Sequence, residues 1–326
     1  MGKWKKINNS EIFQGKLKKK SYFEGWYFKL VDETERNIIA IIPGIALDKK
    51  KNTSHSFIQF FDGISGKANY FKYAIEDFKA EETFFKIKIA NSEFSENSIV
   101  LDINQFDQKI TGELRLRNLI PWPKKFLNPG IMGFFTYLPF LQTYHGLVSM
   151  NHDISGYLRI GDKKITYDKG SKGYTEKDWG SSFPSSWIWM QSNHFSEYQM
   201  SFMLSIATIP MMGNKFTGFL AAIWRKGKFY NFATYTRARI RLIKIREKSA
   251  HIIIEDKKFR LIVNAYQDKA TDLKAPSMGI MLGHCIESMT SRISLKLQDR
   301  TTNKIIFNDV GKNAGLEIMD NDELEI

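Results

Sequence analysis

The chain has 326 residues, of which 43% are apolar and 14% aromatic, so it can bury large hydrophobic cores and global disorder is excluded. Its formal net charge of +13 suits nucleic acid or an anionic membrane surface, but no nucleic-acid-binding motif accompanies the charge. Because its only cysteine, Cys285, excludes an internal disulfide and no secretory signal is recognised, we expect a cytoplasmic protein.

Lysine runs at residues 3–6, 16–20 and 49–51 are the local concentrations of positive charge. They favour peripheral contact with an anionic membrane over nucleic acid as the use of that charge. The partners expected are therefore a small molecule and, at the surface, acidic lipid, with no nucleic acid.

Alternation of apolar and polar residues dominates the first half and predicts short strands. The clearest are residues 38–42, 56–60, 84–89 and 112–117. In the second half the same pattern marks residues 199–207, 218–225, 237–245, 251–255, 259–264, 279–288 and 292–298. Helical spacing is hard to find, so the expected class is all-β with little helix.

Two domains are expected, because single cores stop growing near roughly 250 residues. About twenty strands suit two packed antiparallel barrels of eight to ten strands each. The predicted domains are residues 1–170 and 171–326. Residues 22–26 and 174–179 are similar in type, which favours each half opening with a related strand, although chance could produce the likeness.

Residues 126–144 carry no charge and are nearly long enough to span a bilayer. Pro129, Gly130, Gly133 and Pro139 argue against a regular spanning helix. Two interpretations remain open: a buried loop or strand pair between the domains, or an apolar lip that enters a membrane or gates a lipid-like substrate.

The densest group of reactive side chains lies in residues 173–195. If this segment is extended, Tyr174, Glu176 and Asp178 share one face, and Thr175, Lys177 and Trp179 share the other. Two carboxylates this close in an apolar setting cannot both ionise comfortably, so one could keep a proton and act as an acid. The alternative is a solvated ion pair with lysine.

Polar and aromatic residues continue downstream, where one strand face would carry Trp187, Trp189, Gln191 and Asn193. Amides and indoles of this kind could hold and wall an apolar ligand that bears oxygens. Core packing is the competing interpretation for the tryptophans.

Other candidate groups are weaker. His145 and His152 have a spacing that fits neither one strand face nor one helical turn, so no metal site is predicted. His152, beside Asp153, is a candidate proton donor or a core histidine. Neither a nucleotide-binding loop nor a nucleophile elbow is present, and no cofactor is predicted.

The segment from Tyr174 to Phe195 resembles the signature of the tocopherol cyclase family. The matching positions are Tyr174, Glu176, Lys177, Asp178, Trp179, Gly180, Phe183, Pro184, Trp187, Trp189, Gln191, Asn193 and Phe195. Residues 22–29 resemble the family's opening motif, and the likeness runs over most of the chain. Asp178 departs from the pattern, since the plant enzymes have asparagine there.

The family is related to carotenoid hydratases of the hydroxyneurosporene synthase type, and the resemblance implies two lipocalin-like barrels. It also implies an isomerase that cyclises a prenylated hydroquinone or related isoprenoid. An acid protonates an alkene, and an internal hydroxyl captures the cation. Hydration of a carotenoid or isoprenoid, and non-catalytic binding or carriage of a lipid, are the alternatives.

Residue roles follow from the resemblance and from side-chain type. Asp178 or Glu176 is expected to be the acid, with Tyr174 or His152 as a proton relay. Gln191 and Asn193 would hold the quinol oxygens. The remaining substrate-binding positions expected are Trp179, Trp187, Trp189, Glu24 and Trp26.

Overall fold

A computed structural model describes residues 6–17, 21–48, 53–125, 128–139, 141–211, 213–319 and 324. The chain forms two compact units. The first ends at Phe183 and also takes in Lys274–His284, and the second comprises Pro184–Leu273 and Cys285–Ile326. Most residues of the three lysine runs, at 3–6, 16–20 and 49–51, lie outside the described residues.

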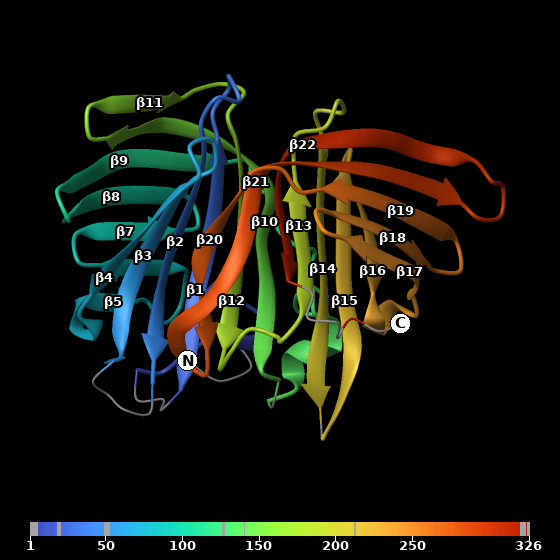
Figure 1. Cartoon of the computed structure of the whole chain (residues 1–326), viewed down its shortest axis with the longest axis horizontal. Coiled ribbons are helices and arrows are strands. Elements are labelled where there is room, and N and C mark those ends of the chain that lie inside the picture. The colour runs from blue at the N-terminus through green and yellow to red at the C-terminus, as the bar shows by residue number, and fades with distance from the viewer. Residues whose placement is uncertain are drawn as a thin grey trace. The chain divides into compact units, whose positions relative to one another are not determined.

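The first unit is built on a 12-stranded antiparallel sheet (Figure 1). Its strand order is β4-β3-β2-β1-β12-β10-β9-β8-β7-β6-β5, and β11 pairs with β10. The strands are β1 (Tyr22–Val31), β2 (Ile38–Leu47), β3 (His55–Asp62), β4 (Lys67–Tyr73), β5 (Phe78–Ala80), β6 (Lys86–Ile89), β7 (Ser92–Ser95), β8 (Ser98–Gln105), β9 (Gln108–Arg117), β10 (Thr143–Ile160), β11 (Lys163–Tyr167) and β12 (Lys172–Gly180).

The second unit is built on a 10-stranded sheet of order β16-β15-β14-β13-β22-β21-β19-β18-β17, in which β20 pairs with β21. Its strands are β13 (Trp187–Ser192), β14 (Met200–Met211), β15 (Asn214–Arg225), β16 (Lys228–Ala233), β17 (Arg239–Arg246), β18 (Ser249–Glu255), β19 (Phe259–Tyr266), β20 (Ala270–Ser277), β21 (Ile280–Asp299) and β22 (Ile305–Met319). Short 3-10 turns are η2 (Ile75–Asp77), η3 (Gly133–Tyr137) and η4 (Thr234–Thr236). The fold is therefore all-β with two lipocalin-like barrels, as the sequence predicts.

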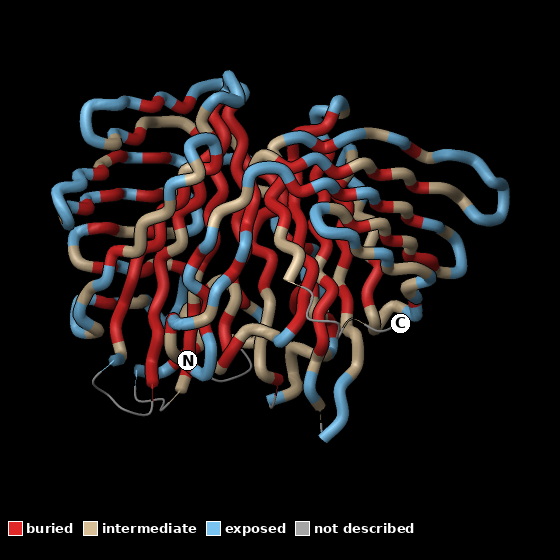
Figure 2. The backbone as a smooth tube through the Cα atoms, viewed as in Figure 1, coloured by how far each residue is buried: buried red, intermediate tan, exposed pale blue. Residues whose placement is uncertain are grey.

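Each sheet turns an apolar face toward its own core, and buried and exposed residues alternate along strands such as β8 and β9 (Figure 2). The first core includes Trp26, Phe28 and Trp179, and the second includes Ile188, Met190 and Leu316. This period of two is the reason that strands could be recognised from the sequence.

Strand β12 lies in the first unit, whereas the sequence predicts that it belongs to the second domain. The predicted boundary after residue 170 would separate β12 from β1 and β10, with both of which it pairs. Because those two ladders hold β12 in the first sheet, the division between the units follows Phe183. The similar segments 22–26 and 174–179 do not open two halves but lie opposite each other, with Glu24 beside Trp179 and Trp26 beside Lys177.

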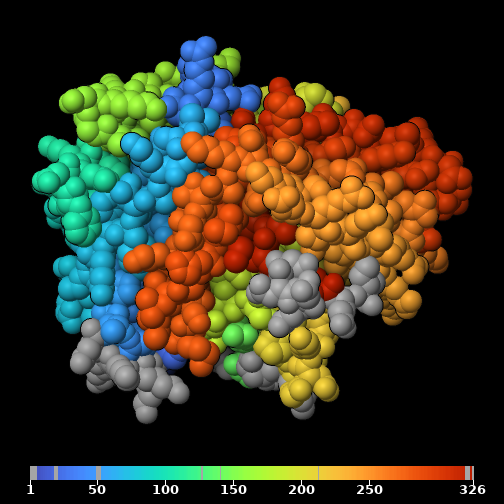
Figure 3. Space-filling view, in the orientation of Figure 1, coloured from blue at the N-terminus to red at the C-terminus, as the bar shows by residue number. Residues whose placement is uncertain are grey.

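The tip of the β20–β21 hairpin belongs to the first unit. Lys274 donates its backbone N–H to Gln59 Oε1 at 3.0 Å, and Met281 packs with Ala46 and Phe57. Figure 3 shows this segment in orange beside the blue strands of the first sheet. The predicted strands 279–288 and 292–298 merge into the long β21, whose pairing with β22 shifts register at several points.

The uncharged segment 126–144 is mostly irregular and contains η3. Ile131 and Gly133 are buried, whereas Phe134 is 50% exposed. Phe126, Leu127 and Phe140 lie outside the described residues. Among the described residues no helix is long and apolar enough to cross a membrane.

Candidate functional site

Strand β12 carries the candidate acids on one face only, as the strand alternation predicts. Tyr174, Glu176 and Asp178 project to the face away from the first core, while Trp179 packs within that core. Glu176 and Tyr174 are buried, and the Asp178 side chain is 25% exposed. The acids thus lie in a largely dry setting with one of them open to a ligand.

His145 completes this group from β10. It lies opposite Asp178 in the β10–β12 ladder, and its Nδ1 is 2.9 Å from Asp178 Oδ1. Its Nε2 is 3.5 Å from Glu176 Oε2 and has no hydrogen-bond partner among the described residues. Tyr174 donates its hydroxyl to Glu176. We call His145, Tyr174, Glu176 and Asp178 the acid–histidine cluster.

The electrostatics of the acid–histidine cluster favour a proton on His145. Burial by itself would lower the pKa of His145, but the negative charges of Glu176 and Asp178 and the hydrogen bond to Asp178 raise it to about 9. Burial, and then the charge of Glu176, raise the pKa of Tyr174 well above its usual value, so its hydroxyl stays protonated. His145 therefore carries a proton at neutral pH and lies between two carboxylates.

The same donor atoms would also suit a metal ion. One ligand atom from each of His145, Glu176 and Asp178 can be chosen so that all lie within 4.8 Å of one another. A nitrogen with two carboxylate oxygens is a known donor set for divalent cations. Residue spacing predicts no metal site here, because His145 meets the two carboxylates only through the pairing of β10 with β12.

Part of the uncharged segment lies against the acid–histidine cluster. The backbone N–H of His145 points to Met132 Sδ at 3.0 Å, and the Tyr144 hydroxyl donates to the Leu138 carbonyl. Phe134, two residues after Met132, is 50% exposed. The uncharged segment therefore contacts the strand that carries His145.

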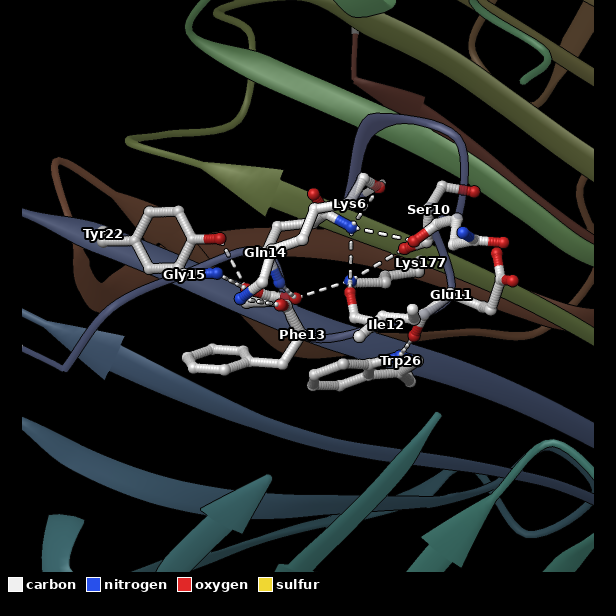
Figure 4. A network of polar contacts seen from close by, with 12 residues as sticks. Lys6, Ser10, Glu11, Ile12, Phe13, Gln14, Gly15, Tyr22, Trp26 and Lys177 are labelled. Atoms are coloured by element: carbon white, nitrogen blue, oxygen red, sulfur yellow. Dashed lines mark hydrogen bonds and ion pairs between the residues drawn. The ribbon is translucent and has the colours of Figure 1, made fainter. Parts of the chain in front are cut away.

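The other face of β12 holds a different set of charges. Lys177 and Glu24 are both fully buried, and Lys177 Nζ is 2.5 Å from Glu24 Oε1. Lys177 also donates to the carbonyls of Ser10 and Ile12, at 2.8 and 2.5 Å, and its Nζ lies 4.6 Å from the Trp26 ring centre (Figure 4). This side chain network is enclosed by the chain segment of residues 6–15.

Comparison with known families agrees with this arrangement. The protein-family model described as "Tocopherol cyclase-like" matches residues 104–319, which include β10, β12 and the whole acid–histidine cluster. The chain belongs to the tocopherol cyclase-like family.

A curated relative in this family is named a probable chloroplastic tocopherol cyclase, from Oryza sativa subsp. japonica. It is 25% identical over 108 residues, which span 32% of this chain and 23% of the rice protein. The match therefore covers less than a quarter of that relative's length.

Solved structures with a similar fold include CghA with Sch210972, at a TM-score of 0.57 and 9% identity, covering 91% of this chain and 88% of that one. Kievitone hydratase from Nectria haematococca has a TM-score of 0.50 and 11% identity, covering 95% and 94%. At these identities the likeness concerns the fold.

Several predicted residues of this tocopherol cyclase-like protein lie apart from the acid–histidine cluster. Trp179 stacks on Tyr144 on the opposite face of β12, with ring centres 5.5 Å apart. Glu24 and Trp26 belong with Lys177. His152 is buried beside Gly173, its Nδ1 is 3.2 Å from Ser149 Oγ, and burial lowers its pKa to about 3. His152 is therefore neutral at physiological pH, as a core histidine would be.

The downstream residues belong to the second unit. Ile188 and Met190 enter its core, so the alternate residues Trp187, Trp189 and Gln191 share the other face of β13 and are buried there. Trp187 donates its indole N–H to Glu317 Oε2 at 2.5 Å. Asn193 follows β13 and is buried. Their substrate-binding roles stay predictions.

Two residues of the site were missed. His145 becomes a partner of Asp178 only through the register of β10 with β12, which a single sequence does not encode in any local pattern. Lys177, which the alternative of a solvated ion pair would expose, is fully buried. The sequence signal for its burial is its position in a Tyr-x-Glu-Lys motif, between two acids that could face inward.

Proposed function

We propose that this protein is an isomerase of the tocopherol cyclase type, which cyclises a prenylated hydroquinone or a related isoprenoid. The observation that carries the proposal is the acid–histidine cluster, in which His145 lies between two carboxylates on a buried strand face. Family membership supports the reaction type, and the adjoining uncharged segment supports an apolar substrate.

Protonation of the alkene is the first step of the proposed reaction. The proton of His145 moves along the 2.9 Å contact from Nδ1 to Asp178 Oδ1, and the partly exposed Asp178 delivers it to the less substituted alkene carbon. The alkene's electron pair forms the new C–H bond, which leaves a tertiary cation. Glu176, held by the Tyr174 hydroxyl, offsets that positive charge.

Ring closure is the second step. The hydroxyl oxygen of the same molecule donates a lone pair to the cation and forms the C–O bond. Its O–H proton returns to Asp178 and then to His145, so substrate and product are isomers and the cluster is regenerated. No redox partner is required.

A matched pair of variants tests this assignment. Asp178→Asn keeps the shape of the side chain but removes the acid. We expect the rate of chromanol formation from a prenyl hydroquinone to fall by about 100-fold or more, because a positioned acid typically contributes that much. Asp153→Asn changes an acid on the same strand as His145 but outside the cluster, and it should keep full activity. Full activity in Asp178→Asn would remove the assignment of Asp178 as the acid.

Hydration is the second candidate reaction. The 25% exposure of the Asp178 side chain would allow a water molecule to reach a cation formed beside it. Capture by water in place of the internal hydroxyl would give a tertiary alcohol. Incubation in ¹⁸O-labelled water distinguishes the two, since only hydration places the label in the product.

Non-catalytic carriage of an isoprenoid remains the third interpretation. A carrier needs an apolar pocket but gains nothing from a histidine held protonated by two carboxylates. Equal ligand binding by the wild-type protein and Asp178→Asn, with no turnover by either, would favour it.

A further inference from the structure

The segment of residues 6–15, which we call the N-terminal strap, is bound to the inner face of the first barrel at one place. Lys177 donates to two strap carbonyls, Trp26 donates its indole N–H to the Glu11 carbonyl at 2.8 Å, and Glu24 accepts from the backbone N–H groups of Gln14 and Gly15 at 2.8 and 2.9 Å (Figure 4). The strap is thus held by hydrogen bonds from two neighbouring strands.

Within this network the charges of Lys177 and Glu24 compensate each other. Glu24 accepts four hydrogen bonds or ion-pair contacts, from Lys177, Gln14, Gly15 and the Tyr22 hydroxyl. Lys177 uses its three protons on Glu24, Ser10 and Ile12. A buried pair satisfied to this extent fixes geometry strongly, because moving either partner leaves a charge without solvent or a counter-charge.

The strap also contacts the strand that carries the histidine. A Cβ built on Gly146 would lie 2.9 Å from Ser10 Cβ and 3.1 Å from the Trp179 ring. The strap therefore packs closely against the backbone of β10 at this residue. Gly146 lies opposite Lys177 in the β10–β12 ladder. The strap therefore contacts one residue pair of this ladder, Gly146 and Lys177, from inside the barrel.

The two rungs on either side of that one hold the proposed catalytic groups. His145 lies opposite Asp178 on one side, and Leu147 lies opposite Glu176 on the other. Their side chains project to the reverse face of the sheet. Fixing the middle rung thus fixes the distances on which the acid–histidine cluster depends.

We infer that Lys177, Glu24 and the N-terminal strap form a positioning device that holds His145, Glu176 and Asp178 in register from the opposite face of the sheet. This inference rests on the proposed function for its biological meaning, but its physical content concerns only the geometry of the cluster. Loosening the strap should separate His145 from the carboxylates that keep it protonated.

Histidine NMR titration of the full-length protein tests the inference without any substrate, in chelator-treated samples so that no metal ion occupies the acid–histidine cluster. The pKa of His145, about 9 in the intact protein, should fall toward 6.5 in Lys177→Met and in Glu24→Gln. It should also fall in the double variant that combines both changes and leaves the net charge of the protein unchanged. Through-space electrostatics alone predicts otherwise: loss of a positive charge at Lys177 would raise the pKa, and loss of a negative charge at Glu24 would lower it. Opposite shifts, or no shift, would overturn the inference.

Two further variants control for folding. Trp26→Phe removes one hydrogen bond to the strap without changing charge, so it keeps the test available where the charge variants unfold, and it should lower the pKa of His145 in the same direction. Glu255→Gln disrupts an ion-pair cluster with Arg241 and Arg260 in the second unit and should leave the pKa of His145 unchanged. An unchanged pKa in a folded Trp26→Phe protein would contradict the inference.

Failure of the inference and failure of the proposed function give different results. If Asp178→Asn abolishes turnover while the strap variants leave the pKa of His145 at its original value, the function stands and the positioning role is wrong. If the strap variants shift that pKa but Asp178→Asn turns over normally, the coupling across the sheet is real and the proposed acid is wrong.

Discussion

The two faces of β12 differ in how completely their charges are compensated. On the inner face, Lys177 and Glu24 have all of their hydrogen-bonding capacity used and no exposure to solvent. On the outer face, His145 Nε2 has no hydrogen-bond partner among the described residues, and Asp178 is partly exposed. The sheet around β12 therefore has a fully paired charge network on one face and a protonated histidine beside a partly exposed acid on the other.

Removal of one partner of the buried Lys177–Glu24 pair should have the largest effect on stability. Lys177→Met leaves Glu24 buried without its counter-charge, and loss of one partner of a buried pair costs about 3–5 kcal/mol. Urea denaturation measures the free energy of unfolding. Lys163→Met, at an exposed position, should change it by less than about 0.5 kcal/mol. A similar, small effect for both variants would mean that the inner face is not the rigid one.

A smaller loss is expected where β12 packs on His152. A Cβ at Gly173 would lie 2.1 Å from His152 Nε2, so Gly173→Ala must displace a fully buried ring and should destabilise the protein by about 1–3 kcal/mol. Gly25→Ala, on the neighbouring strand, meets atoms no closer than 3.7 Å and should be nearly neutral by comparison. Equal thermal midpoints for the two variants would contradict this packing.

The outer face should contribute a pH-dependent share of stability. Because the folded-state pKa of His145, about 9, exceeds its ordinary value of 6.5, the stabilisation is complete below pH 6.5 and is lost as the pH rises through 9. His145→Gln should therefore flatten the stability curve between these pH values. A wild-type curve that is already flat there would show that His145 titrates normally.

The fold was predictable to the extent that it depends on local pattern. Alternation identified about half of the strands, and it assigned the two faces of β12 correctly, because the side-chain period of a strand is fixed by backbone geometry. The place of β12 between β1 and β10 was not predictable, since pairing partners far apart in sequence leave no local trace.

The candidate site was recognised only in part for the same reason. Tyr174, Glu176 and Asp178 stand together in the sequence and in the structure, whereas His145 joins them through a ladder that spans more than 30 residues of chain. Glu24 and Trp26 were predicted to bind substrate, but they contact Lys177 and the strap and not the acids. Burial of a lysine within an acidic motif is a tertiary property that residue type alone does not reveal.

Reaction in deuterium oxide tests the central claim most directly. If the acid–histidine cluster delivers its exchangeable proton to the alkene, the cyclised product of a prenyl hydroquinone should carry one carbon-bound deuterium, detectable by mass spectrometry and NMR. Asp178→Asn should form little or none of this product. Cyclised product without carbon-bound deuterium, or equal labelling and yield in the variant, would contradict the account.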